Sequence, residues 1–334
     1  MMKLKPLAEQ TVVITGASSG IGRVTAIRAA RRGARVVLMG RDEAALRDVA
    51  ETIATRGGTA RHRAGDVGRE EDVEAVANLA ALEFGGFDTW VNNAGVAMFS
   101  RLEETVEADA RRLFDTNFWG TVHGSLVALK TLKLSGGALV NVGSIAGDFG
   151  VPVQGMYSAS KHAVRAFTDT LRIELEAEGA PVSVTLVKPA AVATPIIGNV
   201  VNTTGREAKL PAPHYAPEEV AHAILYAAEH PQRDIYVGGT GRLMSLFAQA
   251  APHLADKVSA RFGEEAQLGE PQGERADNLH APGDHAAAAD EADTGRRSLY
   301  TRATLDPNSP VAAATAASGA LFDLALSILA PRRK

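Results

Sequence analysis

A tyrosine and a lysine stand four residues apart in the stretch YSASK, residues 157–161. On a helix, residues at this spacing share one face with Cβ atoms about 5–6 Å apart, so Tyr157 and Lys161 would be neighbours. Lowering the pKa of a tyrosine from about 10 by about three units takes about 4 kcal/mol. One ammonium about 4 Å away supplies about that much at an effective dielectric constant of 20. We therefore expect an acid–base pair in which Lys161 lowers the pKa of Tyr157, the alternative being an ordinary helical turn.

A glycine-rich loop, TGASSGIG (residues 15–22), follows an apolar run and opens an amphipathic one. Gly16, Gly20 and Gly22 can adopt positive φ and let a ligand approach the backbone closely. The free amides and the dipole at a helix start favour an anion, and the hydroxyls of Ser18 and Ser19 can add donors. The pattern predicts a site for a dinucleotide pyrophosphate; a tight turn without ligand is the alternative.

Alternating short apolar and longer amphipathic segments position these residues between about residues 10 and 245. Strands are expected at 11–16, 34–40, 88–95, 137–144, 181–189 and 234–239, and helices at 21–33, 42–58, 108–133, 157–179 and 218–230. This alternation, with strands apolar on both faces, predicts a doubly wound parallel α/β sheet in a three-layer sandwich. Ligands should bind at the carboxyl ends of its strands.

Composition narrows the classes of function. The chain has 334 residues, 46% of them hydrophobic, and a formal net charge of −4, which gives no reason to expect a nucleic-acid surface. Cys is absent, which excludes disulfides and thiol catalysis and fits a cytoplasmic location. The first ten residues lack an apolar stretch of about 7–15 residues, so no secretory signal is expected. A metal site is not expected either, although HAPGDH (280–285) contains two histidines.

The chain is expected to divide into a dinucleotide-binding domain over 1–262, a disordered linker over 263–310 and an apolar, Ala-rich helix over 311–334. The linker is rich in acid, Ala, Gly and Pro, and poor in large apolar residues. The last segment could pack on the domain or a dimer partner, lie on a membrane surface beside the basic PRRK, or form a loose tail. Small residues and Asp323 argue against a membrane span.

In this order, TGASSGIG, NNAG (92–95), Asn117, Ser144 and YSASK resemble the short-chain dehydrogenase/reductase family over residues 10–240. The resemblance implies a Rossmann-like fold, a nicotinamide cofactor and a Ser–Tyr–Lys site with a supporting Asn. Taken singly, Ser144 could equally be a turn or cap serine, and Asn117 a buried amide between helix and strand.

The resemblance also implies roles for the site residues. Tyr157 would be the acid in reduction and the base in oxidation, and Lys161 would bind the ribose hydroxyls. Ser144 would hold the substrate oxygen, and Asn117 a helix bend and a water. The residues expected at the cofactor are Gly16, Ser18, Ser19, Gly20, Ile21, Gly22, Arg41, Asp66, Val67, Asn93, Tyr157, Lys161, Val192 and Thr194. In KPAAVATP (188–195), Ala190 stands where the family has Gly, which weakens the assignment of Val192 and Thr194.

The end of the second strand predicts the choice between the two nicotinamide coenzymes. NAD enzymes carry an acid there that binds the ribose 2′-hydroxyl, whereas this chain has Gly40 followed by Arg41. A guanidinium offers a planar, charged partner to a 2′-phosphate, so we expect NADP, with NAD as the alternative. Asp42 is expected to cap the next helix instead.

The expected function is NADP(H)-dependent interconversion of a ketone or aldehyde and an alcohol. A non-catalytic cofactor sensor or scaffold is the alternative, and a lyase or epimerase ranks lower. The stretches 145–156 and 195–201 are mostly apolar, which favours an apolar substrate beneath a mobile lid over 196–215. Phe99, Phe149 and Met156 could line its pocket or simply pack in the core. The family resemblance suggests a homodimer or homotetramer.

Overall fold

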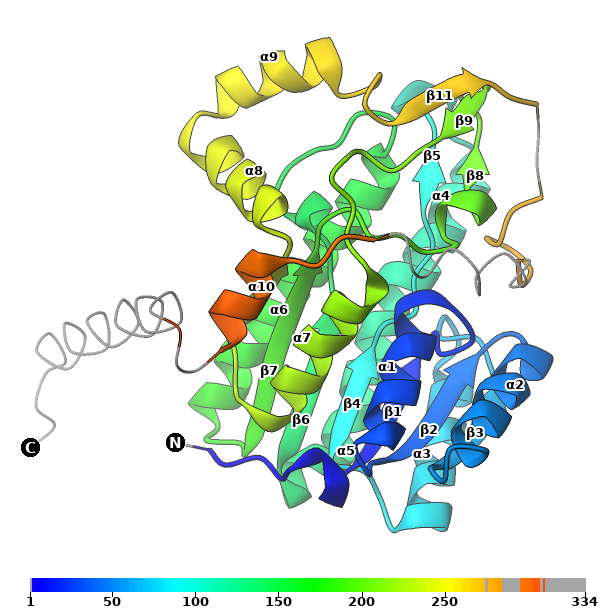
Figure 1. Ribbon diagram of the computed structural model, residues 1–334, viewed down its shortest axis with the longest axis vertical. Helices are drawn as coiled ribbons and strands as arrows, with labels where there is room; N and C mark the ends of the chain where they lie inside the picture. The colour runs from blue at the N-terminus through cyan, green and yellow to red at the C-terminus, as the bar shows by residue number, and fades with distance from the viewer. Residues whose placement is uncertain (1, 274–275, 284–294, 307–308, 310–334) are drawn as a thin grey trace, which may run out of the picture.

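A seven-stranded sheet forms the centre of the computed structural model, which describes residues 2–273, 276–283, 295–306 and 309 (Figure 1). Its neighbours all pair in parallel, in the order β10-β7-β6-β4-β1-β2-β3. The strands are β1 Thr11–Thr15, β2 Arg35–Gly40, β3 Thr59–Ala64, β4 Thr89–Asn92, β6 Gly137–Val142, β7 Val182–Pro189 and β10 Asp234–Val237. The predicted doubly wound, Rossmann-like α/β fold is confirmed.

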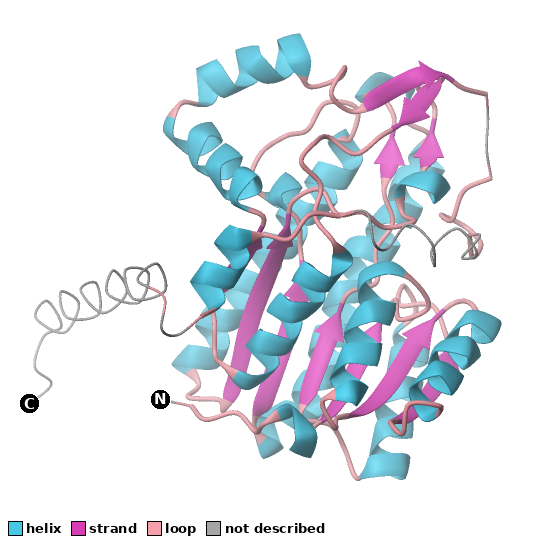
Figure 2. Ribbon diagram, in the orientation of Figure 1, coloured by secondary structure: helices cyan, strands magenta, loops and turns pink. Residues whose placement is uncertain are grey.

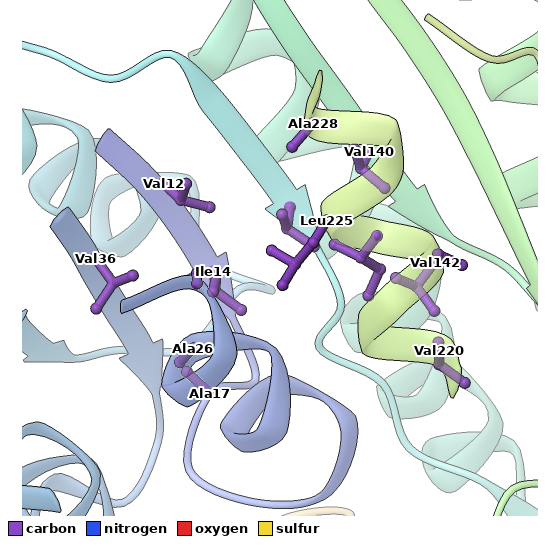
Figure 3. Packing of buried hydrophobic residues seen from close by; sticks show 14 of the residues in the cluster. Val12, Ile14, Ala17, Ala26, Val36, Val140, Val142, Val220, Leu225 and Ala228 are labelled. Carbon is purple, nitrogen blue, oxygen red and sulfur yellow. The ribbon is translucent and has the colours of Figure 1, made fainter. Parts of the chain in front are cut away.

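Helices cover both faces of the sheet (Figure 2). One face carries α1 Gly20–Arg31, α2 Glu43–Ala54 and α7 Pro217–Glu229, and the other α3 Glu70–Phe84, α5 Gly120–Ser135 and α6 Gly155–Ala177. Strand side chains alternate between the layers. In β1, Val12 and Ile14 join the cluster beneath α1 and α7 (Figure 3), whereas Val13 joins the cluster beneath α3, α5 and α6.

The long helix expected over 108–133 is three segments in the structure. It consists of α4 Glu107–Phe114, a π-helical stretch η3 Asp115–Trp119, and α5. The π-helical stretch carries Asn117, whose side chain bonds to the backbone of Val96 outside the helix. A tertiary contact therefore holds the irregular turn at the place where the sequence suggested a bend.

Short elements at the carboxyl edge of the sheet tie down the segment expected to be a lid. β8 Val201–Asn202 pairs with β5 Met98–Phe99, and β9 Arg206–Ala208 pairs with β11 Leu268–Pro271. Segment 196–215 is thus held on two sides.

The 3-10 turns of the described structure are η1 Leu7–Glu9, η2 Leu102–Glu104, η4 Ile145–Gly147 and η5 Ile197–Asn199.

The chain after residue 238 contains helices and a strand that were not predicted from the sequence. Helices α8 Gly239–Ala250 and α9 Pro252–Phe262 project from the body (Figure 1). Helix α10 Leu299–Leu305 docks on α7, where Arg302 donates to buried Glu219 at 2.7 Å. The expected disordered linker over 263–310 therefore does not describe β11, residues 276–283 or α10, which buried contacts hold in place. The segment 311–334, with its three alternatives, lies outside the described residues. Within the described part of the chain, no helix has the length and hydropathy needed to cross a bilayer.

Candidate active site and coenzyme cleft

A cleft opens at the point where the strand order reverses. β1 lies between β2 and β4, so the loops after β1 and β4 leave the sheet in opposite directions and expose its carboxyl edge. The residues lining the cleft are Gly16, Ser18, Ser19, Gly20, Ile21, Gly40, Arg41, Asp42, Gly65, Asp66, Val67, Asn93, Ala94, Gly95, Val96, Thr116, Thr194, Pro195, Ile196, Asn199, Asn278, Pro282 and Gly283. Most of the predicted cofactor residues thus meet in one place.

The glycine loop is packed so tightly that side chains are excluded at two positions. Gly16 has φ +65°, and a Cβ there would lie 2.7 Å from Ala94 Cα. At Gly22 a Cβ would lie 2.1 Å from the Gly16 carbonyl oxygen, so this glycine sits behind the cleft and lets α1 start against the loop. The side-chain amide of Asn93 donates to the carbonyls of Thr15 (2.9 Å) and Gly16 (3.2 Å). Asn93 therefore braces the loop as well as lining the cleft.

The donors around this loop fit a pyrophosphate. Ser19 is the residue before α1, and its hydroxyl makes no capping bond to the helix within the described structure. The first amides of a 12-residue helix and the hydroxyls of Ser18 and Ser19 thus meet at the cleft wall. A bound nicotinamide dinucleotide would find anion donors here and polar groups further along, at Arg41 and Asp66.

The far end of the cleft is built around two arginines. Arg41 donates to the backbone carbonyls of Leu279 (2.9 Å) and Asn278. Asp66 accepts from Arg112 and also from the Gly68 amide at 2.9 Å. Burial, followed by the nearby Arg112, lowers the pKa of Arg41. One cation, Arg41, and one carboxylate, Asp66, therefore face the place where the sequence predicts the adenosine ribose, and Arg112 holds the carboxylate from behind.

Asp42 and Val67 complete this end. The Asp42 side chain accepts from the Ala45 amide at 3.0 Å and caps α2, as predicted. Val67 lines the cleft and is fixed by its carbonyl, which bonds to His123 Nδ1 at 3.0 Å.

The Ser, Tyr and Lys residues expected to be catalytic lie close together, but they are not among the residues that line the cleft; Lys161 approaches it behind Gly95. Tyr157 and Lys161 lie on the first turns of α6, with Lys161 Nζ 5.8 Å from the centre of the Tyr157 ring. Ser144 follows β6, and its hydroxyl lies near enough to the Tyr157 phenol to influence it, while it caps η4 by accepting from the Ala146 amide at 3.1 Å. The cap is thus seen in the structure, and the role of Ser144 at the substrate stays a prediction.

The electrostatics of the pair differ from the sequence-based expectation. Burial raises the pKa of Tyr157, with the Ser144 hydroxyl acting in the opposite direction. Burial also lowers the pKa of Lys161 to about 8. The expected lowering of the Tyr157 pKa by Lys161 is therefore not found, because burial disfavours the phenolate.

Asn117 links the loop after β4 to α6 beside these residues. It accepts from the Val96 amide (2.8 Å) and donates to the Val96 carbonyl (2.9 Å) and to Ser160 on α6 (3.1 Å). A Cβ on Gly95, which lines the cleft, would lie 3.3 Å from Asn117 Oδ1 and 3.6 Å from Lys161 Nζ. Asn117 and Lys161 therefore meet directly beside the coenzyme cleft.

Some predicted residues lie elsewhere, and some lining residues were missed. Thr194 lines the cleft, but Val192 is buried in the core cluster beneath α7. Thr15, which accepts from the amides of Asn93 and Ala94, was missed although it ends an apolar strand. Apart from Ala94 and Gly95 of the NNAG motif, the missed lining residues are Gly40, Asp42, Gly65, Val96, Thr116, Pro195, Ile196, Asn199, Asn278, Pro282 and Gly283. The last three come from a polar stretch with no periodicity, which gives no signal.

Comparison with known families bears directly on this geometry. The family model described as short chain dehydrogenase matches residues 10–205, more than half of the chain. The chain belongs to this family. The chain is similar to an uncharacterized oxidoreductase, YxnA, of Bacillus subtilis, with 42% identity over 92% of this chain and 88% of that protein. It is also similar to the putative oxidoreductase SadH of Mycobacterium tuberculosis, with 31% identity over 72% of this chain and 90% of that protein.

Two solved structures are also similar to this chain. A short chain dehydrogenase/reductase from Burkholderia phymatum in complex with NAD is 28% identical, covers 76% of this chain and 96% of its own, and has a TM-score of 0.67. An alcohol dehydrogenase from Thermococcus sibiricus complexed with 5-hydroxy-NADP is 28% identical. The match covers 68% of this chain and 95% of that chain, with a TM-score of 0.60. This short-chain dehydrogenase is an NAD(P)-dependent oxidoreductase.

Proposed function

We propose that the enzyme uses NADPH to reduce an apolar ketone or aldehyde to an alcohol, and that Tyr157 is the proton donor. The observation that carries the proposal is the proximity of Tyr157 to Ser144, one helical turn from buried Lys161, whose Nζ lies behind Gly95 in the wall of the cleft that holds the glycine loop. This arrangement provides a proton donor and a hydroxyl for a single reacting oxygen, with a cation beside the proton donor.

The raised pKa of Tyr157 supports a role as proton donor in carbonyl reduction. When bound in the cleft, NADPH would supply the hydride that the carbonyl carbon accepts. Because burial raises the pKa of Tyr157, its phenol stays protonated at neutral pH and can give its proton to the carbonyl oxygen. The Ser144 hydroxyl donates a second hydrogen bond to that oxygen. Oxidation of the alcohol would need the phenolate and is therefore favoured by alkaline pH.

Lys161 and Asn117 support this step without touching the substrate. Lys161 Nζ donates to the Val142 carbonyl at 3.1 Å, which keeps the ammonium between the strand and the cleft. We assign to it the ribose hydroxyls of the coenzyme. Asn117 fixes the loop at Val96 through two bonds, and we assign to it a water that returns protons toward Lys161.

Arg41 supports the choice of NADPH. It lines the cleft at the carboxyl end of β2, and Gly40 stands where an acid would bind a ribose 2′-hydroxyl. Asp42 is engaged in capping α2, so its carboxylate has a structural role there. A guanidinium at this end favours a 2′-phosphate by charge and by paired N–H donors.

The surroundings of Tyr157 support an apolar substrate. Tyr157 packs against two buried apolar clusters, one containing Phe99 and Val153 and the other Met98 and Leu113. Phe99 is only 1% exposed and packs in the core beside the tyrosine. A charged substrate would lose its hydration here without a matching partner.

Family resemblance and exposed apolar side chains on α8 and α9 support a homodimer or homotetramer. Leu243 and Phe262 are 68% and 63% exposed. Light scattering coupled to size exclusion should give two or four times the chain mass of 35.0 kDa. A single chain mass at working concentration would refute this assignment.

The experiment that tests the function follows coenzyme oxidation with a panel of aryl and alkyl ketones and aldehydes. We expect turnover with NADPH and a kcat/KM for NADPH at least about tenfold above that for NADH, from one charge-assisted contact of about 1.4 kcal/mol or more. Tyr157→Phe is the control, because it removes the proton donor and keeps the ring. Coenzyme binding without turnover on any carbonyl would favour the alternative, a sensor or scaffold.

A further inference from the structure

Residues 276–283, here named the strap, cross the coenzyme cleft. They follow β11 and return toward the carboxyl edge of the sheet near α2 (Figure 1). Asn278, Pro282 and Gly283 line the same cleft as the glycine loop and Arg41. A part of the chain well outside the matched dehydrogenase region therefore forms a wall of its coenzyme site.

One buried side chain anchors the strap. Leu279 is 0% exposed and packs in the cluster of Val96, Met98, Leu113 and Val201. These neighbours come from the loop after β4, from β5, α4 and β8, so the strap is fixed to four separate parts of the fold.

Hydrogen bonds secure the strap on both sides of its anchor. The Asn278 amide donates to the Asn199 carbonyl at 2.9 Å, which ties the strap to η5. His280 Nε2 bonds to Asp109 Oδ1 on α4 at 2.8 Å. A segment with these contacts holds one position relative to the cleft rather than sampling many.

The strap also holds the arginine expected at the 2′-phosphate. The Leu279 carbonyl accepts from Arg41 at 2.9 Å and from Arg112 at 3.2 Å, and the Asn278 carbonyl accepts from Arg41. A guanidinium has five N–H donors in one plane, so two carbonyls fix that plane and leave donors for a ligand. Arg41 still lines the cleft while it makes these bonds.

We propose that the strap is a structural wall of the coenzyme site and that Leu279 is a positioning residue, which holds Arg41 toward the 2′-phosphate of NADPH. The inference rests on the proposed NADPH preference. The alternative is competition, in which the strap carbonyls would occupy the Arg41 guanidinium in place of the 2′-phosphate. The fully buried anchor and the donors left on Arg41 favour positioning.

The test measures binding of NADPH and of NADH to the full chain by coenzyme fluorescence, without substrate. Leu279→Ala removes the anchor and keeps the backbone carbonyls. We expect its Kd for NADPH to rise about tenfold, the value of one charge-assisted contact, and its Kd for NADH to change less than about twofold. Faster hydrogen exchange of residues 276–283 should accompany the change.

Two further variants make the test decisive. Leu132→Ala removes the same side-chain volume from a separate apolar cluster beneath α5, away from the strap, and it should leave the ratio of the two Kd values unchanged. Replacing residues 276–283 by eight alternating glycines and serines keeps the connection to α10 and should reproduce the Leu279→Ala ratio. This replacement also serves if Leu279→Ala does not fold.

Each other outcome overturns the inference. Equal weakening of both coenzymes would make the strap a cover that does not act through Arg41. Tighter NADPH binding would show competition, and unchanged binding would show no role. Arg41→Ala separates these failures from that of the proposed function. If Arg41→Ala leaves the ratio of the Kd values for NADPH and NADH unchanged, the proposed coenzyme preference is wrong. If Arg41→Ala changes this ratio and Leu279→Ala does not, only the strap inference fails.

Discussion

Replacing Lys161 with methionine should stabilise the fold near neutral pH while abolishing turnover. Lys161 is 5% exposed, and burial lowers its pKa from 10.5 to about 8. Methionine has a similar length and carries no charge, so it fills the same space without the desolvation penalty. The chain would thus gain stability by losing a functional group, as is common at active sites.

The magnitude follows from the two pKa values. Below pH 8 the ammonium is charged in both states, and the gap between 10.5 and about 8 corresponds to about 3 kcal/mol of lost folding stability. The variant loses the bond from Nζ to the Val142 carbonyl, a loss of about 1 kcal/mol. We therefore expect Lys161→Met to be about 2 kcal/mol more stable at pH 7.

The sign of the pH dependence is set by the lowered pKa. Between pH 8 and 10.5 the unfolded chain binds the proton and the folded chain does not, so the stability of the unsubstituted protein rises with pH. At pH 9.5 the charge penalty falls to about 1.4 kcal/mol, which nearly cancels the lost hydrogen bond. The advantage of the variant should thus almost disappear by pH 9.5.

The assay is urea unfolding without coenzyme at pH 7.0, 8.5 and 9.5, followed by tryptophan fluorescence and circular dichroism. Coincident transitions by both probes would justify a single free energy of unfolding. Lys257→Met, at an exposed position on α9, is the matched control for the substitution itself. A variant that is less stable than the parent at pH 7, or an advantage that stays constant to pH 9.5, would refute the reasoning.

Further outcomes follow from the glycine loop, the C-terminal helix and the phenol. Gly22→Ala places a Cβ 2.1 Å from a carbonyl oxygen and should destabilise the fold by about 3 kcal/mol, whereas Gly150→Ala, with open space around it, should be neutral in urea unfolding. Arg302→Ala leaves the buried Glu219 carboxylate without its cation and should lower stability by about 2 kcal/mol; equal urea midpoints would contradict this. Alcohol oxidation should rise steeply above pH 8 while ketone reduction stays level from pH 6 to 8, because Tyr157 has a raised pKa; parallel profiles would contradict this.

The sheet could be predicted because its central strands are apolar on both faces. The strand β3, Thr59–Ala64, was missed because it lies at the sheet edge and its sequence TARHRA has no apolar run. The π-helical turn at Asp115–Trp119 has no local cause either, since it depends on the contact between Asn117 and Val96. The local hydrophobic pattern predicts helices and strands well where they are buried along their whole length. It predicts them poorly where a single tertiary contact determines the local conformation.

The C-terminal region shows the same limit. Its composition favours disorder, yet Leu268, Leu279 and Leu305 are each at most 5% exposed in the structure. Single leucines spaced this far apart produce no helical or strand periodicity, so their burial depends on pockets formed elsewhere in the chain. Sequence reasoning could not assign residues 276–283 to the cleft for this reason.

The active-site residues were easier to locate than to describe electrostatically. Spacing on one helix brought Tyr157 and Lys161 together as expected. The direction of their pKa values depends on burial by residues from several elements, which no local spacing encodes.

The most direct test of the central claim is single-turnover reduction of a ketone by enzyme preloaded with NADPH, comparing Tyr157→Phe with the unsubstituted protein. The account predicts an unchanged Kd for NADPH and a hydride-transfer rate lower by about a thousandfold, within the range for removal of a general acid. A rate within about tenfold of the parent would show that another group donates the proton and would contradict the account.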